Sequence, residues 1–253
     1  MYALDKGADG IEADFHLTAD GEVVAIHDFD IDRTSDSTGR VSELSLDQMR
    51  LLDYSSWKRG FIPAGYGKID EQLLTLGELL ELLLCFGKDV KFSLELKHPS
   101  VFGRELEDAV MRTLLTYGYD PATSTIAGVD SAVRITLMSF SSTALDHLRD
   151  HHQVPTKHLT ALFHNHPEID STWGLTAREF ALENPDSIIG CGLKYVKVNE
   201  AEVRDWIARG RKLGVWTSNT ADDSLYLLDL GVQSITTNYP AQIREALRHS
   251  HSS

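Results

Sequence analysis

The sequence predicts one α/β domain of the TIM (β/α)8-barrel type. Short apolar or β-branched runs alternate with segments of helical spacing along most of the chain, as in a parallel sheet built from βα units. The length of 253 residues suits a single domain of this kind. Polar and charged residues stand at the ends of the predicted strands, where such barrels collect their active residues. We expect this domain over residues 1–248 and a short tail over 249–253.

Seven strands and seven helices are predicted from the pattern of apolar residues. The strands are expected near residues 10–16, 90–97, 135–140, 159–163, 193–198, 214–218 and 234–238. The helices are expected over residues 73–86, 104–117, 142–151, 177–183, 200–213, 221–230 and 241–249. Gly214 and Gly231 each stand where a helix should stop before a strand.

Two stretches depart from this alternation. Residues 23–69 open with a hairpin strand after the Asp20-Gly21 turn and continue through polar and Gly/Pro-rich segments, so we expect an insertion on the barrel rim. Residues 1–7 have the pattern of the end of a helix, and only seven strands are found. We therefore expect a barrel that is N-terminally truncated by about one βα unit, which is on the order of 30 residues.

Composition restricts the partners and the compartment. With 24 Lys and Arg against 38 Asp and Glu the net charge is −14, which argues against a nucleic acid or an anionic membrane as the main partner. An anionic small molecule would need a local cation to bind. No apolar run approaches the roughly 18 residues of a membrane helix, and no signal peptide is visible. We expect a cytoplasmic protein with Cys85 and Cys191 as buried free thiols, and the oligomeric state stays open.

Paired charges in two predicted strands indicate a cation site. Glu12 and Asp14 lie two positions apart, so the strand turns both carboxylates to one face, and Glu95 and Lys97 repeat this spacing. If these strands are neighbours, three carboxylates from two strands form a cage of oxygen atoms. Such a cage suits one hard divalent cation, Mg²⁺ or Ca²⁺, whereas zinc usually takes more His or Cys ligands.

Four further side chains are considered together with this cage. Lys97 supplies a second positive centre for a phosphate group. His27, at the end of the hairpin strand, is a candidate acid or base. His16 shares the face of the acidic pair by parity, but we expect it to make a structural hydrogen bond. Arg33 either guides a phosphate or pairs with Asp32 or Asp36.

These motifs resemble the glycerophosphodiester phosphodiesterase family. The family signature is a His-Arg pair followed by Glu-x-Asp and a His, and the chain supplies Glu12-Ala13-Asp14 and His27. The resemblance extends to about residue 248 through the matching stretches Thr18-Ala19-Asp20-Gly21, Asp32-Arg33-Thr34, Thr38-Gly39, Glu95-Leu96-Lys97, Ser139-Phe140, Val215-Trp216-Thr217 with Asn219, and Ile235 to Pro240.

The resemblance implies metal-dependent hydrolysis of small glycerophosphodiesters to glycerol 3-phosphate and an alcohol on an eightfold barrel, an activity of lipid metabolism. It implies that the glycerol hydroxyl of the substrate attacks phosphorus and that water opens the resulting cyclic phosphate. The roles it implies are metal binding by Glu12, Asp14 and Glu95, phosphate contact by Lys97, and proton transfer by His27. Trp216 stands at the end of a predicted strand, where we expect it to form an apolar wall for the glycerol.

Two departures from the family pattern keep other functions open. No His-Arg pair precedes Glu12, so one acid or base worth roughly 10²- to 10⁴-fold in rate is missing, and we expect impaired activity. Asn238 stands where many relatives have Asp, which affects a rim contact only. The alternatives are a catalytically inactive barrel that binds a cation and a phosphodiester, and a lipid phosphodiesterase of the sphingomyelinase D type.

Overall fold

Parallel strands alternate with helices along the chain, as the sequence predicts. The computed structural model describes residues 1–58, 62–164 and 176–250. These residues form two compact units, one made of Met1–Tyr2 and Ala13–Ile135 and the other of Ala3–Glu12 and Thr136–Ser253. The divisions fall inside the strands β1 (Gly10–Leu17) and β5 (Ala132–Ser139), so each of these strands belongs partly to both units.

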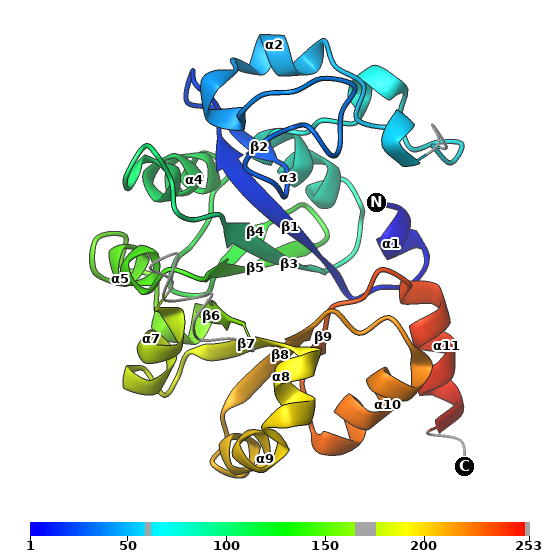
Figure 1. Cartoon of the computed structure of the whole chain (residues 1–253), viewed down its shortest axis with the longest axis vertical. Helices are drawn as coiled ribbons and strands as arrows, with labels where there is room; N and C mark the ends of the chain where they lie inside the picture. Colours follow the sequence, from blue (N-terminus) through cyan, green and yellow to red (C-terminus); the bar gives the residue numbers. More distant parts are fainter. Residues whose placement is uncertain (59–61, 165–175, 251–253) are drawn as a thin grey trace. The chain divides into compact units, whose positions relative to one another are not determined.

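The first unit contains most of β1 and the start of β5, and both strands are labelled in Figure 1. Its elements are β1 (Gly10–Leu17), β2 (Val23–Ala25), α2 (Leu46–Arg50), α3 (Leu76–Leu84), β3 (Val90–Leu96), α4 (Glu105–Thr116), β4 (Thr125–Ala127) and β5 (Ala132–Ser139), with short 3-10 turns at Val41–Glu43, Ser56–Lys58 and Ile69–Glu71. Strand order in this unit is β2-β1-β3-β5, and β4 pairs with β5 as an antiparallel strand.

The predicted hairpin is present in the first unit. Phe15 pairs with Ala25 and Leu17 with Val23, so β1 and β2 are antiparallel. Gly21 closes the turn with φ of +87°, a conformation that glycine adopts without steric cost, and its N–H donates to the carbonyl of Thr18 (3.1 Å). The hairpin brings the residues after β2 back alongside β1.

Two apolar clusters hold the first unit together. In β3 the alternate residues Val90, Phe92, Leu94 and Leu96 are all buried, and Phe92 meets the ring of Phe15 edge to face. A second cluster lies within residues 23–73, the greater part of which is the expected rim insertion. It consists of Val24, Ile26, Ile31, Val41, Met49 and Leu73. These residues have a core of their own, and their place on a barrel rim stays a prediction.

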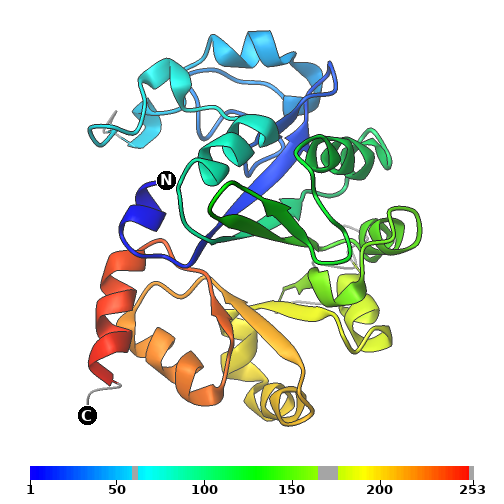
Figure 2. The same cartoon turned by 180° about the vertical axis from the view of Figure 1, so that it is seen from behind.

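The second unit contains the rest of β5 and a run of parallel strands. Its elements are α1 (Tyr2–Asp5), α5 (Ser142–Asp150), β6 (Leu159–Phe163), α7 (Ala177–Glu183), β7 (Ile188–Gly192), α8 (Leu193–Val198), α9 (Glu200–Ala208), β8 (Lys212–Trp216), α10 (Ala221–Leu230), β9 (Ser234–Ile235) and α11 (Pro240–Ser250), with a 3-10 turn at Thr156–His158. The strands β5 to β9 pair in sequence order and in parallel. Figure 2 shows α10 and α11, in orange and red, side by side.

The strand predicted over residues 193–198 is wrong. That segment is helix α8, and the strand is the preceding β7, whose five residues are Ile-Ile-Gly-Cys-Gly. A Cβ on Gly190 would lie 2.4 Å from the Cδ2 atom of Leu162 in β6, so only glycine fits at this strand pairing. The two glycines weaken the apolar signal of β7, and the β-branched residues of α8 imitate a strand.

Two smaller expectations, on Gly214 and on Cys85, need correction. Gly214 lies inside β8 and stops no helix, because α9 already ends at Ala208. Gly231 does end α10, in the left-handed conformation expected of a helix stop. Cys191 is buried, and burial raises the pKa of its thiol to about 12, but Cys85 is exposed. No helix in the described part of the chain is long and apolar enough to cross a membrane.

Candidate active site

The paired charges predicted from the sequence lie on β1 and β3, which are neighbours in the sheet. Glu12 and Asp14 lie within β1 rather than at its end, because the strand continues into the hairpin. Glu95 is the last residue but one of β3, and Lys97 follows the strand directly. The N–H of Lys97 donates to the carbonyl of Phe15 (3.2 Å), which holds the end of β3 against β1 beside Asp14.

The ammonium group of Lys97 joins two of the carboxylates. Its Nζ lies 2.9 Å from Oδ1 of Asp14 and 2.9 Å from Oε1 of Glu95. The side chains of Lys97, Asp14 and Glu95 are only 13%, 17% and 9% exposed. Coulomb attraction is weakly screened at such a site, so the three charges are strongly coupled.

Burial sets the protonation of this group. Burial raises the pKa of Glu95 to about 7, with a further rise from the charge of Asp14 and an opposing effect of Lys97. Burial alone lowers the pKa of Lys97, but the Glu95 and Asp14 carboxylates outweigh it and the net shift is upward. Lys97 is therefore charged at neutral pH, while Glu95 can gain or lose a proton there.

Glu12 completes a group of ligand atoms suited to a cation. One carboxylate oxygen each of Glu12, Asp14 and Glu95 lies within 4.8 Å of the other two. All three donors are carboxylate oxygens, which hard divalent cations prefer. The expected convergence of these carboxylates is confirmed, and the donor set fits the divalent cation expected from the sequence.

His27 follows the hairpin and is held by a carboxylate. Its Nδ1 lies 2.6 Å from Oδ1 of Asp28, and the other oxygen of Asp28 accepts from Nε of Arg33 (2.6 Å). Hydrogen bonding from Arg33, aided by His27, lowers the pKa of Asp28 to about 2. Because Asp28 is ionised at neutral pH, Nδ1 of His27 donates to it, and Nε2 is left as the ring atom for proton transfer.

Sequence reasoning missed the part that Asp28 plays. It also left the partner of Arg33 open, and the guanidinium pairs with Asp28 rather than with Asp32 or Asp36. The Arg33 guanidinium also lies over the ring of Trp57, 5.5 Å from its centroid. The only sequence signal is that Asp28 directly follows the histidine, and this alone does not predict a hydrogen bond.

His16 has the structural character that we expect for it. Its side chain is buried, Nε2 lies 3.3 Å from the carbonyl oxygen of His27, and its ring meets Phe29 edge to face. Burial lowers the pKa of His16 to about 4, the backbone contact to His27 only partly opposing it. At neutral pH the ring is uncharged.

Trp216, in the second unit, belongs to an aromatic cluster. It is the last residue of β8, and its ring meets Phe140 and His164, which follow β5 and β6. The ring centroids lie 5.7 Å apart in both pairs, and Phe140 and His164 stack at 4.4 Å. The indole N–H of Trp216 is buried and meets no hydrogen-bond acceptor among the described residues. Residues 165–175, which follow His164, lie outside the described residues.

Comparison with known proteins identifies the family. The family model described as "Glycerophosphoryl diester phosphodiesterase family" matches residues 1–242. A Mycobacterium tuberculosis protein named "Probable glycerophosphodiester phosphodiesterase 1" is 32% identical over 243 residues, covering 96% of this chain and 83% of the relative. A glycerophosphodiester phosphodiesterase of Bacillus subtilis is 28% identical, covering 92% and 74%. The chain belongs to the glycerophosphodiester phosphodiesterase family.

Solved structures of this family support the fold class. A phosphodiesterase of Oleispira antarctica, solved in complex with the product sn-glycerol-3-phosphate, matches 96% of this chain and 87% of its own with a TM-score of 0.76 at 23% identity. One from Silicibacter pomeroyi matches with a TM-score of 0.74 at 22% identity. The α/β class of the TIM-barrel type is confirmed. The family is one of phosphoric diester hydrolases, and the activity in its name is the hydrolysis of glycerophosphodiesters.

A second feature that sequence reasoning missed lies just beyond Lys97. Glu107 of α4 is completely buried, and its Oε1 lies 3.1 Å from Nε2 of His98 and 2.5 Å from a guanidinium nitrogen of Arg104. These contacts tie the residue next to Lys97 to the interior of the first unit. A glutamate in the first turn of a helix usually faces solvent, so the sequence offers no signal for this role.

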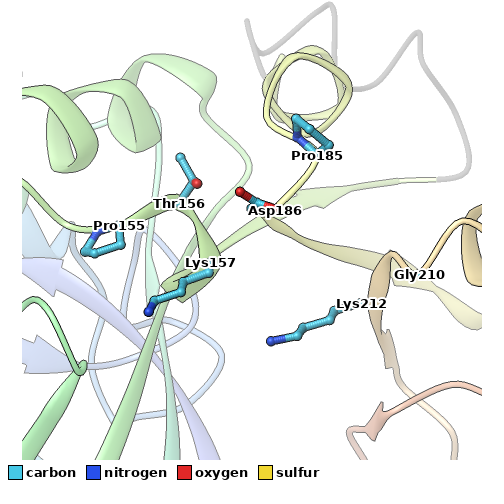
Figure 3. A pocket seen from close by; sticks show the side chains of 7 residues that line it. All are labelled: Pro155, Thr156, Lys157, Pro185, Asp186, Gly210 and Lys212. Atoms are coloured by element: carbon cyan, nitrogen blue, oxygen red, sulfur yellow. The ribbon is translucent and has the colours of Figure 1, made fainter.

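A cavity of about 380 Å³ lies at the amino ends of the strands β6, β7 and β8 in the second unit (Figure 3). It is lined by residues that precede or begin β6, β7 and β8, among them Lys157, Asp186 and Lys212. Barrel enzymes use the carboxyl ends of their strands, where Trp216 stands, so we do not assign the phosphodiester substrate to this cavity.

Proposed function

We propose that this member of the glycerophosphodiester phosphodiesterase family hydrolyses glycerophosphodiesters to glycerol 3-phosphate and an alcohol, with the charges on β1 and β3 as its reaction centre. The observation that carries this proposal is the group formed by Asp14, Glu95 and Lys97. In this largely buried site, the ammonium of Lys97 lies 2.9 Å from an oxygen of each carboxylate. Burying these charges costs desolvation free energy. Clusters of this kind are found preferentially where a ligand or a reaction uses them.

Glu12, Asp14 and Glu95 are the proposed ligands of one Mg²⁺ or Ca²⁺ ion. Their oxygens lie within 4.8 Å of one another, and no sulfur or imidazole ligand stands among them. Such a cation, when bound, offsets the charge of the phosphodiester and favours deprotonation of a hydroxyl group beside it. On a chain with net charge −14, this local positive charge also makes binding of an anionic substrate favourable.

Lys97 is the proposed phosphate contact. Its ammonium is charged at neutral pH and nearly buried, so its attraction for a phosphoryl oxygen is weakly screened. A compact ammonium with three donors can keep a carboxylate as partner while it donates to the phosphate. The fixed backbone contact between Lys97 and Phe15 keeps the start of this side chain in place.

His27 is the proposed group for proton transfer. Its side chain is 63% exposed, so substrate and water can reach Nε2. The Asp28 carboxylate holds Nδ1 and so orients the ring, and Arg33 fixes that carboxylate in turn. Removal of such an acid or base lowers the rate by roughly 10²- to 10⁴-fold.

Trp216 is the proposed apolar wall for the glycerol part of the substrate. Its ring is supported by Phe140 and His164, which limits its freedom to turn. The buried indole N–H adds a donor that a substrate hydroxyl could satisfy. A wall that carries one donor suits glycerol, whose carbon chain is flanked by hydroxyl groups.

The test follows release of glycerol 3-phosphate from glycerophosphocholine by the purified chain with Mg²⁺ or Ca²⁺, together with calorimetric binding of glycerol 3-phosphate. We expect hydrolysis that EDTA abolishes, and loss of both hydrolysis and product binding in Glu95→Gln and Lys97→Met. His27→Gln should lose hydrolysis and keep product binding. Glu183→Gln and His158→Gln, which change a glutamate and a histidine outside the site, are the matched controls.

Three results would overturn the proposal in different ways. Cation and glycerophosphocholine binding without turnover in any condition would indicate a binding protein. Turnover of sphingomyelin in preference to glycerophosphocholine would indicate a lipid phosphodiesterase. Hydrolysis that survives Glu95→Gln and Lys97→Met unchanged would show that the reaction centre lies elsewhere. A cytoplasmic location and a small-molecule partner without nucleic acid stay predictions from the composition.

A further inference from the structure

Three histidines gather at the C-terminal end of α5, in the second unit. They are His147 within the helix, His151 at its C-cap and His152 just after it. The rings of His147 and His151 stack with centroids 4.8 Å apart, and His152 lies edge-on to both, at 5.2 Å from His147 and 4.9 Å from His151. Every ring of the three contacts the other two.

The end of the helix sets this arrangement. Positions four apart share one face of a helix, so His147 and His151 are neighbours by spacing alone. The N–H groups of both His151 and His152 point to the carbonyl oxygen of His147, at 2.9 and 3.4 Å. Gln153 then takes a φ of +56°, and Val154 donates back to the carbonyl of Leu148. The chain therefore turns sharply after His152 and keeps its ring beside the other two.

The nitrogen atoms of these rings are close enough to serve one metal ion. One ring nitrogen of each histidine lies within 4.8 Å of those of the other two. The atoms of a bound metal's ligands lie about 3 to 4 Å apart when each is about 2 Å from the ion, so small side-chain rotations suffice. Two histidines at a four-residue spacing on a helix form a standard pair of ligands, and the third supplies the remaining direction.

The charges around the cluster favour a cation. The rings stand at the C-terminal end of a helix, where the last carbonyl groups carry partial negative charge. On α5 itself, the carboxylates of Asp146 and Asp150 are paired with Arg149 at 2.8 and 2.6 Å. The imidazoles are therefore the ligands that this helix end offers, which distinguishes the site from the all-carboxylate group on β1 and β3.

We propose that His147, His151 and His152 bind a borderline transition-metal ion, with Zn²⁺ as the ion of choice and Co²⁺ or Ni²⁺ able to replace it. Imidazole is a ligand for these ions and not for Mg²⁺ or Ca²⁺. The three histidines supply three of the four ligands of a tetrahedral site. The ion joins the end of α5 to the turn that leads towards β6, and so stabilises the second unit.

The test is a calorimetric titration of the untagged chain with Zn²⁺ in excess Mg²⁺, which fills the carboxylate group but does not compete for imidazole. We expect one site per chain, with Zn²⁺ affinity lowered by about tenfold or more in His147→Ala, His151→Ala and His152→Ala. His151 is exposed, so its replacement leaves the helix packing intact. His158→Gln is the matched control and should bind as the unchanged chain does.

Cobalt gives a second readout, independent of heat. Co²⁺ should give the intense visible bands of a tetrahedral or five-coordinate site, and these should be lost in His151→Ala. The same variant should hydrolyse glycerophosphocholine at the unchanged rate, which separates failure of this proposal from failure of the proposed function. Binding that is unaffected by all three alanine variants, or no saturable Zn²⁺ binding at all, would overturn the proposal.

Discussion

The first unit holds two groups of charged side chains that are built in opposite ways. In the group on β1 and β3, the side chains of Asp14, Glu95 and Lys97 are at most 17% exposed and their pKa values are set by burial and by one another. In the group after β2, Arg33, Asp28 and His27 form a chain that is largely open to water. In the group on β1 and β3, strong charge–charge interactions affect the stability of the protein. In the group after β2, the charges mainly orient the ring of His27.

The largest expected effect is the loss of unfolding free energy when Lys97 is replaced in the group on β1 and β3. Lys97→Met removes the ammonium that joins the largely buried carboxylates of Asp14 and Glu95, and we expect the metal-free protein to lose about 3 to 5 kcal/mol of unfolding free energy. Chemical denaturation in EDTA measures this loss. Added Mg²⁺ should restore part of it, because a bound cation compensates the same carboxylates. A loss below about 1 kcal/mol in EDTA would mean that water screens the group far more than its burial indicates.

The second prediction concerns how the unfolding free energy depends on pH through the buried ring of His16. The pKa of His16 is about 4 in the folded protein against 6.5 in the unfolded chain, so below pH 6.5 only the unfolded chain takes up the proton. Its contribution is present above pH 6.5 and is lost as the pH falls towards 4, by about 3 kcal/mol at most. Denaturation between pH 4 and 8 should show a steeper decline for the unchanged protein than for His16→Gln. Parallel curves would refute the buried, uncharged ring.

The third prediction concerns cation binding at the buried group. Because Glu95 has a pKa of about 7, a cation must displace its proton at lower pH. Affinity for Mg²⁺ should fall by up to about tenfold per pH unit below 7 and level off above it. Calorimetry in buffers of different ionisation enthalpy should detect nearly one proton released at pH 6 and almost none at pH 8. Equal proton release at both values would place the titrating group elsewhere.

The smallest effect is expected in the exposed group. Arg33→Met breaks a surface pair with Asp28, so unfolding free energy should change by less than about 1 kcal/mol. The rate should still fall several-fold, because the carboxylate that holds His27 becomes free to move. The ratio of rate loss to stability loss, measured beside that for Lys97→Met, sharpens the contrast between orientation and stored charge. A stability loss as large as that of Lys97→Met would remove the contrast.

The sequence predicted the buried group better than the exposed one. The alternation of side chains along a strand predicts the placement of Asp14, Glu95 and Lys97, and it needs only two neighbouring strands. The same rule places the exposed Glu12 beside them. The pairing of Asp28 with His27 depends on side-chain rotation in a turn, which no periodicity encodes. The stack of Phe140 on His164 depends on the relative register of β5 and β6, which is set by packing between strands.

The wrong prediction for residues 188–198 also arises from packing between strands, which the local sequence pattern does not encode. Residues 188–192 form β7 although two of the five are glycine. One of them, Gly190, lies so close to Leu162 of β6 that a larger residue would clash there. Residues 193–198 are rich in residues that favour strands, yet they form a helix after Gly192. Local preference and long-range packing disagree here, and packing decides.

The two cysteines differ in exposure, so their reactivity reports on whether the protein is folded. Cys85 is open to solvent, whereas Cys191 is enclosed in β7 and stays protonated at any ordinary pH. Alkylating reagents should label the first quickly and the second only when β7 separates from its neighbours. Counting labelled cysteines by mass spectrometry would therefore report, without any engineered probe, how often the second unit opens.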